Sequence, residues 1–331
     1  MKKVFIVALA LFTFFACKKD KKTEEPTPDP TPVSTCPPAS CTTPDSVWTP
    51  TGTGPRLVFK FKFDSTQIRL NNLGQPSTIP AANAAFSPIF RKMSAHYIEM
   101  AQNDLTAVGA GKVLYKAPET GTNCAGANAI TFCQSVVVKE GDIFFSIPIA
   151  SVTPGSYKWL RVSLAYQNYD IAFKTGSCSG TQWGTIASFL GFNTYVTEYK
   201  IKNKTFAPTA SVGGPGNHKQ GYWGFESKVC GFYDYFGDGQ PPAGATTVVN
   251  PNSINSPIPA GSCLVTGEFY NGSSLSPLII TGSETSDIII TVSLSTNKSF
   301  EWKEVTFDGY FQPEAGESPV DMGVRGMIPK Y

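Results

Sequence analysis

Short stretches in which apolar and polar residues alternate most constrain the fold of this chain. The clearest is Arg56–Asp64 (RLVFKFKFD), in which four apolar side chains alternate with two lysines and a valine. Successive side chains of a β-strand point to opposite faces, so a period of two predicts a strand with one buried face. Ser156–Leu164 (SYKWLRVSL) alternates in the same way. Both are predicted strands, and the folded domain is expected to begin at residue 56.

Further segments rich in β-branched and aromatic residues, separated by Gly and Pro, extend this pattern. Ten or more short strands without a long amphipathic helix predict an all-β fold, an antiparallel β-sandwich of immunoglobulin-like or jelly-roll-like form. The other expected strands are Phe90–Met100 (with Met93, Ala95 and Tyr97 on one face), Val113–Lys116, Ser135–Val138, Asp142–Ile149, Gln167–Phe173, Tyr195–Ile201, Gly221–Ser227, Thr246–Val249, Cys263–Tyr270, Leu278–Thr281, Asp287–Ser295 and Phe300–Phe307.

Two segments carry more specific expectations. Ile288–Ile290 is apolar throughout, which predicts a central strand buried on both faces. Thr185–Phe192 is expected to form a short helix. It lies within residues 176–244, an aromatic-rich and glycine-rich insertion that is either an elaboration of the sandwich or a separate lobe. Both alternatives stay open, and residues 56–331 are treated as one β-sandwich domain.

The first residues show a pattern typical of exported proteins. Two lysines precede an apolar run, Val4–Phe15, which is too short to span a bilayer core of about 30 Å. The following FFAC resembles a bacterial lipobox, in which the cysteine is acylated, for example with palmitate, and becomes the new N-terminus. We therefore expect residues 1–16 to be a signal peptide and Cys17 to carry lipid. Two or more acyl chains would anchor the protein stably in a membrane.

The residues after Cys17 suggest where this lipoprotein is displayed. The charged stretch KKDKKTEE resembles the post-cysteine signals of Bacteroidota surface lipoproteins. The expected location is the outer membrane, lipid-anchored and facing the cell exterior. Residues 18–55 hold nine prolines, which favour extended polyproline II geometry. Residues 17–55 are therefore predicted to be a lipidated N-terminus followed by a Pro-rich tether.

Charge composition excludes one class of partner. Cleavage after residue 16 would remove two of the 27 basic residues and leave 25, equal to the 25 acidic residues. A chain without net side-chain charge has no electrostatic basis for binding nucleic acid. The sequence predicts no nucleic-acid partner, and a membrane attachment that depends on the lipid anchor alone.

The cysteines predict disulfides, because exported proteins mature in an oxidising space. Cys36 and Cys41, and also Cys124 and Cys133, are close enough in sequence to pair locally. Two of the three remaining cysteines can pair, and Cys178–Cys230 is the interpretation that we favour. Cys263 would then be left over, as a buried thiol that packs like a small apolar side chain.

Aromatic residues give the main indication of a ligand site. Trp183, Tyr222, Trp223 and Tyr235 lie in the aromatic-rich insertion. Exposed Trp and Tyr rings stack on sugars or peptides and are enriched at recognition sites. These four residues are the candidate binding residues for a glycan, a peptide or an outer-membrane protein complex. The alternative is that they fill the core between the sheets.

Three residues are candidate metal ligands. His218 lies in a glycine-rich loop, and Asp234 and Asp238 belong to the segment DYFGDG. This segment partly resembles an oxygen-ligand calcium loop but lacks the middle acid and the distal glutamate of an EF-hand. A plain turn is the other interpretation of DYFGDG. No cofactor is expected, with calcium or copper as the alternatives.

The order of several motifs resembles the MbnP-like proteins, which are exported copper-binding β-proteins. The resemblance involves RLVFKFKF, IPIASVTPGSYKWLRVSLAYQN, HKQGYWGFES and IIITVSL. Metal binding in that family uses a histidine and a modified tryptophan. The resemblance therefore implies a copper site in which His218 and Trp223 take part.

No catalytic residues are assigned, since the sequence holds no GxSxG, HExxH or P-loop motif. The favoured hypothesis is a lipid-anchored, non-catalytic binding or structural module of the outer membrane. An MbnP-like copper-binding protein is one alternative, and an unrecognised hydrolase is another.

The lipid anchor generates the first testable prediction. Mass spectrometry of the mature N-terminal peptide should show Cys17 as the first residue, with a mass increased by its acyl chains. The mature protein should also partition into the detergent phase, because two or more acyl chains favour that phase. An unmodified N-terminus on a freely diffusing protein would contradict the prediction.

Overall fold

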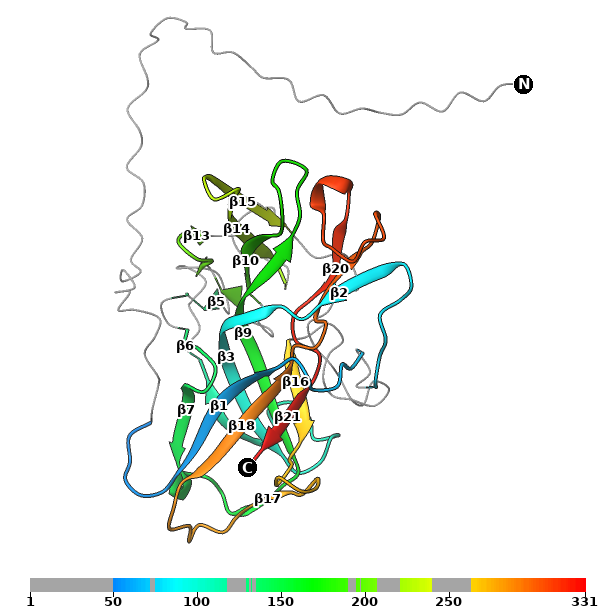
Figure 1. Ribbon diagram of the computed structural model, residues 1–331. Helices are drawn as coiled ribbons and strands as arrows, with labels where there is room; N and C mark the ends of the chain where they lie inside the picture. Colours follow the sequence, from blue (N-terminus) through cyan, green and yellow to red (C-terminus); the bar gives the residue numbers. More distant parts are fainter. Residues whose placement is uncertain are drawn as a thin grey trace, which may run out of the picture. The chain divides into compact units, whose positions relative to one another are not determined.

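The computed structural model describes residues 50–71, 75–117, 129–130, 132, 135–189, 195–196, 198–206, 221–239 and 263–331. Regular structure within these residues consists of β-strands and short 3-10 turns, with no α-helix among them. This confirms the predicted all-β, sandwich-like fold (Figure 1). The predicted strand Thr246–Val249 lies outside the described residues.

The largest sheet has eight strands and is built around β9, which spans Trp159–Phe173. Along one edge, β9 pairs with β3 over most of its length. Along the other edge it pairs first with β16 and then with β10. The remaining order is β15-β14-β10-β9-β3-β4, with β6 attached to β3. The strands are β3 (Ile89–Ala101), β4 (Lys112–Lys116), β6 (Val137–Val138), β10 (Gln182–Phe189), β14 (Trp223–Val229), β15 (Tyr233–Gly239) and β16 (Leu264–Glu268).

A β-bulge lies at the middle of β9. Ser94 of β3 pairs with Tyr166, whereas the next residue, Ala95, pairs with Leu164, so Ala165 has no partner in β3. An extra residue of this kind shifts the alternation of side chains by one position, so residues on either side of it that are an odd number apart share a face. Leu164 and Gln167 therefore lie on the same face of the sheet. The same point marks the change of neighbour from β16 to β10.

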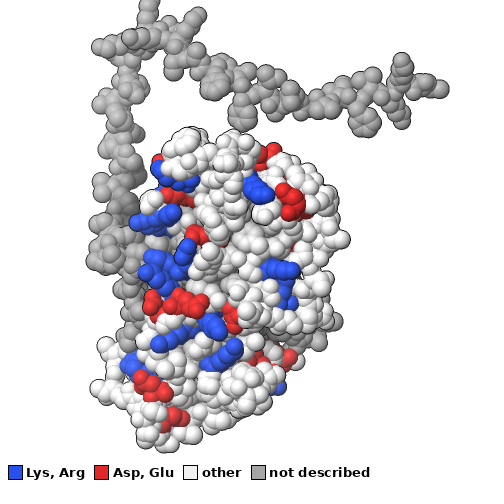
Figure 2. Space-filling view, viewed as in Figure 1, with Lys and Arg blue, Asp and Glu red and all other residues white. Residues whose placement is uncertain are grey.

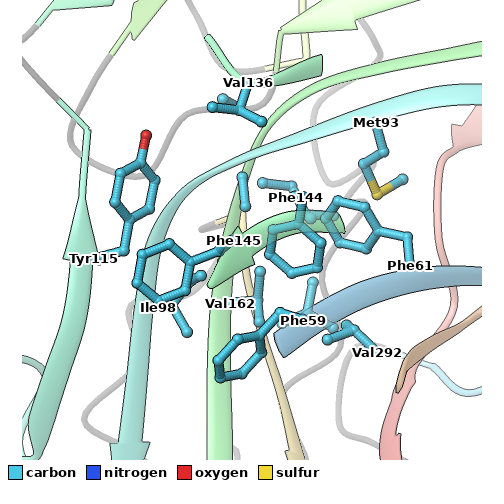
Figure 3. Close-up of a cluster of buried hydrophobic side chains, with 14 of the residues drawn as sticks. Phe59, Phe61, Met93, Ile98, Tyr115, Val136, Phe144, Phe145, Val162 and Val292 are labelled. Carbon is cyan, nitrogen blue, oxygen red and sulfur yellow. The ribbon is translucent and has the colours of Figure 1, made fainter. Parts of the chain in front are cut away.

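A second sheet covers one half of this face. Its order is β21-β18-β1-β7, and β1 runs parallel to β18 while the other pairs are antiparallel. Its inward side chains, such as Phe59 and Val292, pack against Ile98 and Val162 of the large sheet (Figure 3). The strands are β1 (Arg56–Asp64), β7 (Ile143–Pro148), β18 (Ile288–Ser295) and β21 (Met327–Lys330).

A third, three-stranded sheet covers the other half of the face and encloses a second hydrophobic core. Its strands are β2 (Asn83–Phe86), β19 (Phe300–Lys303) and β20 (Ser318–Met322). Trp302, which is 1% exposed, packs with Phe300 and Phe311 against the second half of β9. The β9 side chains in this core are Tyr169, Ile171 and Phe173. Short additional pairs involve β5 (Ala129–Ile130), β8 (Gly155–Tyr157), β11 (Tyr195–Val196), β12 (Tyr199–Lys200), β13 (Thr205–Phe206) and β17 (Leu278–Ile280).

Several local predictions need correction. The helix expected over Thr185–Phe192 is wrong, because residues 185–189 belong to β10, which pairs with β9 and β14, while residues 190–192 lie outside the described part of the chain. Ile288–Ile290 lies in an internal strand as predicted, but Ile289 is 52% exposed, so the expectation that both faces are buried is wrong. The grouping of Tyr97 with Met93 and Ala95 is also wrong. The register shifts between Ala95 and Tyr97, and Tyr97 packs in a separate cluster with Leu264.

Two predicted strands are interrupted. Ser156–Leu164 is divided at Lys158 between β8 and β9, whereas Gln167–Phe173 continues β9. Tyr195–Ile201 contains the two short strands β11 and β12. The described part of residues 176–244 joins the large sheet through β10, β14 and β15, so these strands elaborate the sandwich.

A buried ion pair fastens the connection between β3 and β4. Arg161 and Glu99 are 1% and 0% exposed at their side chains, with Nη1 and Oε2 separated by 3.4 Å. Glu99 also accepts backbone hydrogen bonds from Gly109 and Gly111. The Arg161 guanidinium donates to the backbone carbonyls of Asp104, Thr106 and Ala107. Both buried charges are thus compensated by one loop, which is the condition for tolerating them.

This ion pair generates the second prediction. Arg161→Met would leave the Glu99 carboxylate buried without its cation, and should lower the free energy of unfolding by about 3–5 kcal/mol. Lys228→Met is the matched control, since it breaks the exposed Lys228–Asp234 pair. We expect that control to cost less than about 1 kcal/mol. Equal losses in urea-induced unfolding would contradict the proposed role of the buried pair.

Candidate functional site

An open cleft of about 820 Å³ lies beside the second core. One wall is the β14–β15 hairpin, and the other includes η4 (Pro313–Ala315) and β20. The lining is mainly aromatic and apolar. It comprises Ile171, Phe173, Ile186, Trp223, Phe225, Val229, Phe232, Tyr233, Tyr235, Phe300, Phe311, Pro313, Pro319 and Met322, together with Thr175, Ser177, Cys230, Gly237, Asp238, Glu314, Glu317 and Ser318. Concave apolar surfaces with a few polar groups are typical of ligand sites.

The hairpin wall presents aromatic rings because two aromatic residues of β14 each lie opposite a glycine of β15. Phe225 pairs with Gly237, and Trp223 pairs with Gly239. A Cβ atom at Gly239 would lie 2.7 Å from the Trp223 ring. On the other neighbouring strand, a Cβ atom at Gly184 would lie 2.2 Å from the Phe225 ring. Because these glycines have no side chain, the Trp223 and Phe225 rings can lie close to the backbone of the neighbouring strands.

A disulfide fixes one end of the hairpin. Cys178 and Cys230 are bonded, with their Cα atoms 5.5 Å apart, which confirms the predicted pair. The bond connects the β9–β10 loop to the turn between β14 and β15. The Cys230 amide also donates a 3.0 Å hydrogen bond to the Gln182 side chain. The predicted local pairs Cys36–Cys41 and Cys124–Cys133, and the lipidation site Cys17, lie outside the described residues.

The opposite wall is held by hydrogen bonds to two carboxylates, of which Glu317 is buried and Glu314 exposed. Glu317 accepts hydrogen bonds from the backbone amides of Val305, Thr306 and Gln312. Burial alone raises the pKa of Glu317, but these donors outweigh it and bring the pKa below its ordinary value. Glu314 accepts a 2.7 Å hydrogen bond from the Gly176 amide. These acids therefore shape the loop beside the cleft, and the lowered pKa of Glu317 favours its charged form.

The electrostatic character of the cleft follows from its lining. Glu314 and Glu317 line it, as does Asp238, whose carboxylate accepts from the Tyr222 hydroxyl, and no Lys or Arg occurs among the described lining residues. Elsewhere on the visible face, charged side chains of both signs are interspersed (Figure 2). The cleft thus combines aromatic surface with negative charge, which disfavours an anionic ligand.

The structure brings only part of the predicted aromatic set together. Trp223 and Tyr235 line the cleft, and Tyr235 is 46% exposed. Tyr222 is buried, and its hydroxyl donates to Asp238. Trp183 is 52% exposed, but it does not face the cleft. It directly precedes Gly184, which contacts the Phe225 ring on the cleft face, and successive residues of a strand point to opposite faces.

Other aromatic residues complete the cleft and were not among the predicted binding residues. Phe225 lies between Trp223 and Val229 on β14, and Phe232 and Tyr233 are 76% and 59% exposed beside the hairpin turn. The signal in the sequence is the spacing of two, in Trp223-x-Phe225 and in Tyr233-x-Tyr235. That spacing places each pair on one face of its strand.

The predicted metal ligands do not converge in the described residues. Asp234 pairs with Lys228 at 3.1 Å, whereas Asp238 accepts from Tyr222 at the other end of β15. The turn expected for DYFGDG is wrong, because these residues form an extended strand paired with β14. His218 lies outside the described residues, and no group of three metal-ligating side chains occurs within them. The copper site implied for His218 and Trp223 stays a prediction.

A buried polar cluster lies in the large sheet. The Ser163 hydroxyl is 2.7 Å from His96 Nε2 and 2.8 Å from Cys263 Sγ. Burial, together with the charge of Lys116, lowers the pKa of His96 to about 3. Burial raises the pKa of the Cys263 thiol. The arrangement includes the residue types of a nucleophilic site, but all three side chains are almost fully buried, and Cys263 is the free, buried thiol that was predicted.

No protein-family model matches this chain, and no curated protein or solved structure shows significant similarity to it. The part of the chain that the structure describes holds no helical stretch capable of spanning a lipid bilayer. The functional assignment therefore depends on the geometry of the cleft and on the sequence.

The buried histidine generates the third prediction. The pKa of His96 is about 3 in the folded chain and 6.5 without the fold, so between these values only the unfolded chain takes up the proton. The free energy of unfolding should therefore fall as the pH decreases from 6.5, with a slope approaching about 1.4 kcal/mol per pH unit from this group.

His96→Gln, which keeps a hydrogen-bonding side chain without the titration, is the matched variant. Its free energy of unfolding, measured in urea between about pH 5 and 6.5, should depend less on pH than that of the unaltered protein. Identical slopes for the two proteins would contradict the assignment.

Proposed function

We propose that this protein is a lipid-anchored, non-catalytic binding module of the outer membrane that holds a neutral glycan in the aromatic cleft. The observation that carries the proposal is the pair of rings, Trp223 and Tyr235, on one face of the hairpin. The C–H face of a pyranose ring is apolar and packs on an aromatic ring, while its hydroxyl groups require hydrogen-bond acceptors.

The rim of the cleft supports a neutral sugar over an anionic one. Glu314 lies in the lining and is exposed, and its carboxylate can accept hydrogen bonds from hydroxyl groups. A uronic acid or a phosphorylated glycan would place its charge near Glu314 and Glu317, and the described lining residues include no cation to balance it. An uncharged hexose polymer avoids this electrostatic repulsion.

The shape of the cleft supports a chain-like ligand. It is open, and its volume of about 820 Å³ lies toward the upper end of the 300–1,000 Å³ that is typical of ligand pockets. Exposed rings continue beyond Trp223 through Tyr235 and Tyr233 to Phe232. Several successive sugar rings can stack on such a row.

The expected anchor and tether complete the proposal. Lipid on Cys17 would hold the protein at the outer membrane, and residues 17–55 would keep the β-domain clear of the lipid surface. A domain held in this way can retain an external polysaccharide near the cell. The Cys178–Cys230 disulfide fits this location, since disulfides persist in oxidising compartments.

The fourth prediction tests the cleft. The mature lipoprotein in detergent is screened against arrayed neutral, acidic and amino glycans, and the strongest neutral ligand is titrated by calorimetry. Trp223→Ala should weaken its binding by at least about tenfold, the loss expected for a central aromatic anchor.

Trp183→Ala is the matched control, because it removes an exposed tryptophan from the opposite face. Its affinity for the glycan should equal that of the unaltered protein. Equal losses in the two variants would contradict the proposal. Absence of any glycan ligand, or selective binding of unmodified peptides in the cleft, would also contradict it.

A further inference from the structure

We infer that the Cys178–Cys230 disulfide is a redox switch of the aromatic cleft: its reduction loosens the hairpin wall and weakens binding of the glycan, an effect that rests on the proposed function. The basis is the loop between β9 and β10, residues 174–181, which is attached to both walls of the cleft. Two residues of this loop, Thr175 and Ser177, line the cleft.

Hydrogen bonds attach one end of this loop to the wall that includes η4. The Lys174 amide donates to the Phe311 carbonyl at 2.8 Å, and the Gly176 amide donates to the Glu314 side chain at 2.7 Å. The Lys174 ammonium group also lies 3.2 Å from the centroid of the Tyr310 ring. This attachment consists of several separate contacts, and none of them involves the disulfide.

The disulfide is the covalent link between the same loop and the turn of the β14–β15 hairpin. The Cys230 amide adds one hydrogen bond, to the Gln182 side chain at 3.0 Å. Phe232 and Tyr233, which follow in the turn, are 76% and 59% exposed. Among the described strands, β15 pairs with β14 alone. The position of the turn therefore depends strongly on the disulfide.

The opposite end of the hairpin is held without the disulfide. The Tyr222 hydroxyl donates to the Asp238 carboxylate, and the ring of Phe236 lies against that of Phe206, with centroids 5.5 Å apart. Reduction should therefore leave this end in place and free the turn end. Movement of the turn end would displace the exposed aromatic rings there from the rest of the cleft.

The backbone of Cys230 favours such a movement. Its φ is 52°, a left-handed conformation that residues other than glycine seldom adopt. Gly231 follows with a φ of 79°, and hairpin turns with two positive φ angles prefer asparagine, aspartate or glycine at the first position. A strained conformation of this kind persists only where the surroundings impose it. Breaking the S–S bond removes one of the constraints and favours relaxation of the turn.

The chemistry is thiol–disulfide exchange with a dithiol reductant. One thiolate of the dithiol attacks a sulfur of the Cys178–Cys230 bond and forms a mixed disulfide, which the second thiol of the reductant resolves. The S–S bond of the protein breaks, and two electrons and two protons convert the sulfurs to thiols. The dithiol is oxidised to its own disulfide. Both cysteines are only partly buried, which gives the reductant access.

The first measurement needs no ligand. Amide hydrogen exchange is compared in the oxidised mature lipoprotein in detergent and in the same protein treated with dithiothreitol. Reduction should speed exchange of residues 229–235 by at least about tenfold and leave β9 unchanged. Alkylation of the released thiols and peptide mass spectrometry will show that Cys178 and Cys230 are the reduced pair.

Cys178→Ser combined with Cys230→Ser is the matched control, because the reductant can also reach other disulfides. This variant should exchange at the turn as fast as the reduced protein, and the reductant should cause no further change. Near-ultraviolet circular dichroism will show that the variant is folded. The comparison of oxidised with reduced unaltered protein decides the question even if the variant does not fold.

Calorimetric titration of the neutral glycan then links the switch to binding. Reduction should weaken the glycan by at least about threefold, because a loosened wall must be ordered again when the ligand binds. Unchanged exchange at the turn after reduction would overturn the inference, as would an unchanged affinity for the glycan. If no glycan binds the oxidised protein, the proposed function fails, and the exchange measurement still decides whether the disulfide controls the wall.

Discussion

Strand β9 is the element on which the other features depend. Its 15 residues pair with β3 along one edge and with β16 and then β10 along the other. The bulge at Ala165 lies where the neighbour changes, and it keeps the apolar side chains of both halves on one face. Without this extra residue, Tyr169 and Ile171 would point away from the second core, and the sheet could not support two covering layers.

The same strand separates two surfaces of different chemistry. Ile171 and Phe173 line the aromatic cleft on one face, whereas Asn168 and Asp170 line a smaller pocket of about 380 Å³ on the other. Alternation along a strand makes this separation automatic. The described lining of the cleft is mainly aromatic and apolar, whereas that of the pocket is mainly polar and charged.

The sequence predicts much of this fold because alternation is a local property. It identifies β1, β3 and most of β9, and it identifies the pairing of Cys178 with Cys230. It does not identify β10, for which a helix is predicted, because β10 owes its conformation to pairing with β9 and β14. Only Trp223 and Tyr235 of the four predicted binding residues line the cleft, for a related reason. Trp223 and Trp183 look equivalent in the sequence, and only the sheet register assigns them to opposite faces.

Hydrogen–deuterium exchange with and without a bound neutral glycan tests the central claim most directly. In the free protein, amides of β9 should exchange more slowly than those of the β14–β15 hairpin, because β9 is buried and paired on both edges. The glycan should then slow exchange in the hairpin and leave β9 unchanged, as expected for a preformed cleft on a rigid strand. Faster exchange in β9 than in the hairpin would contradict the account, as would glycan-induced changes confined to the opposite face.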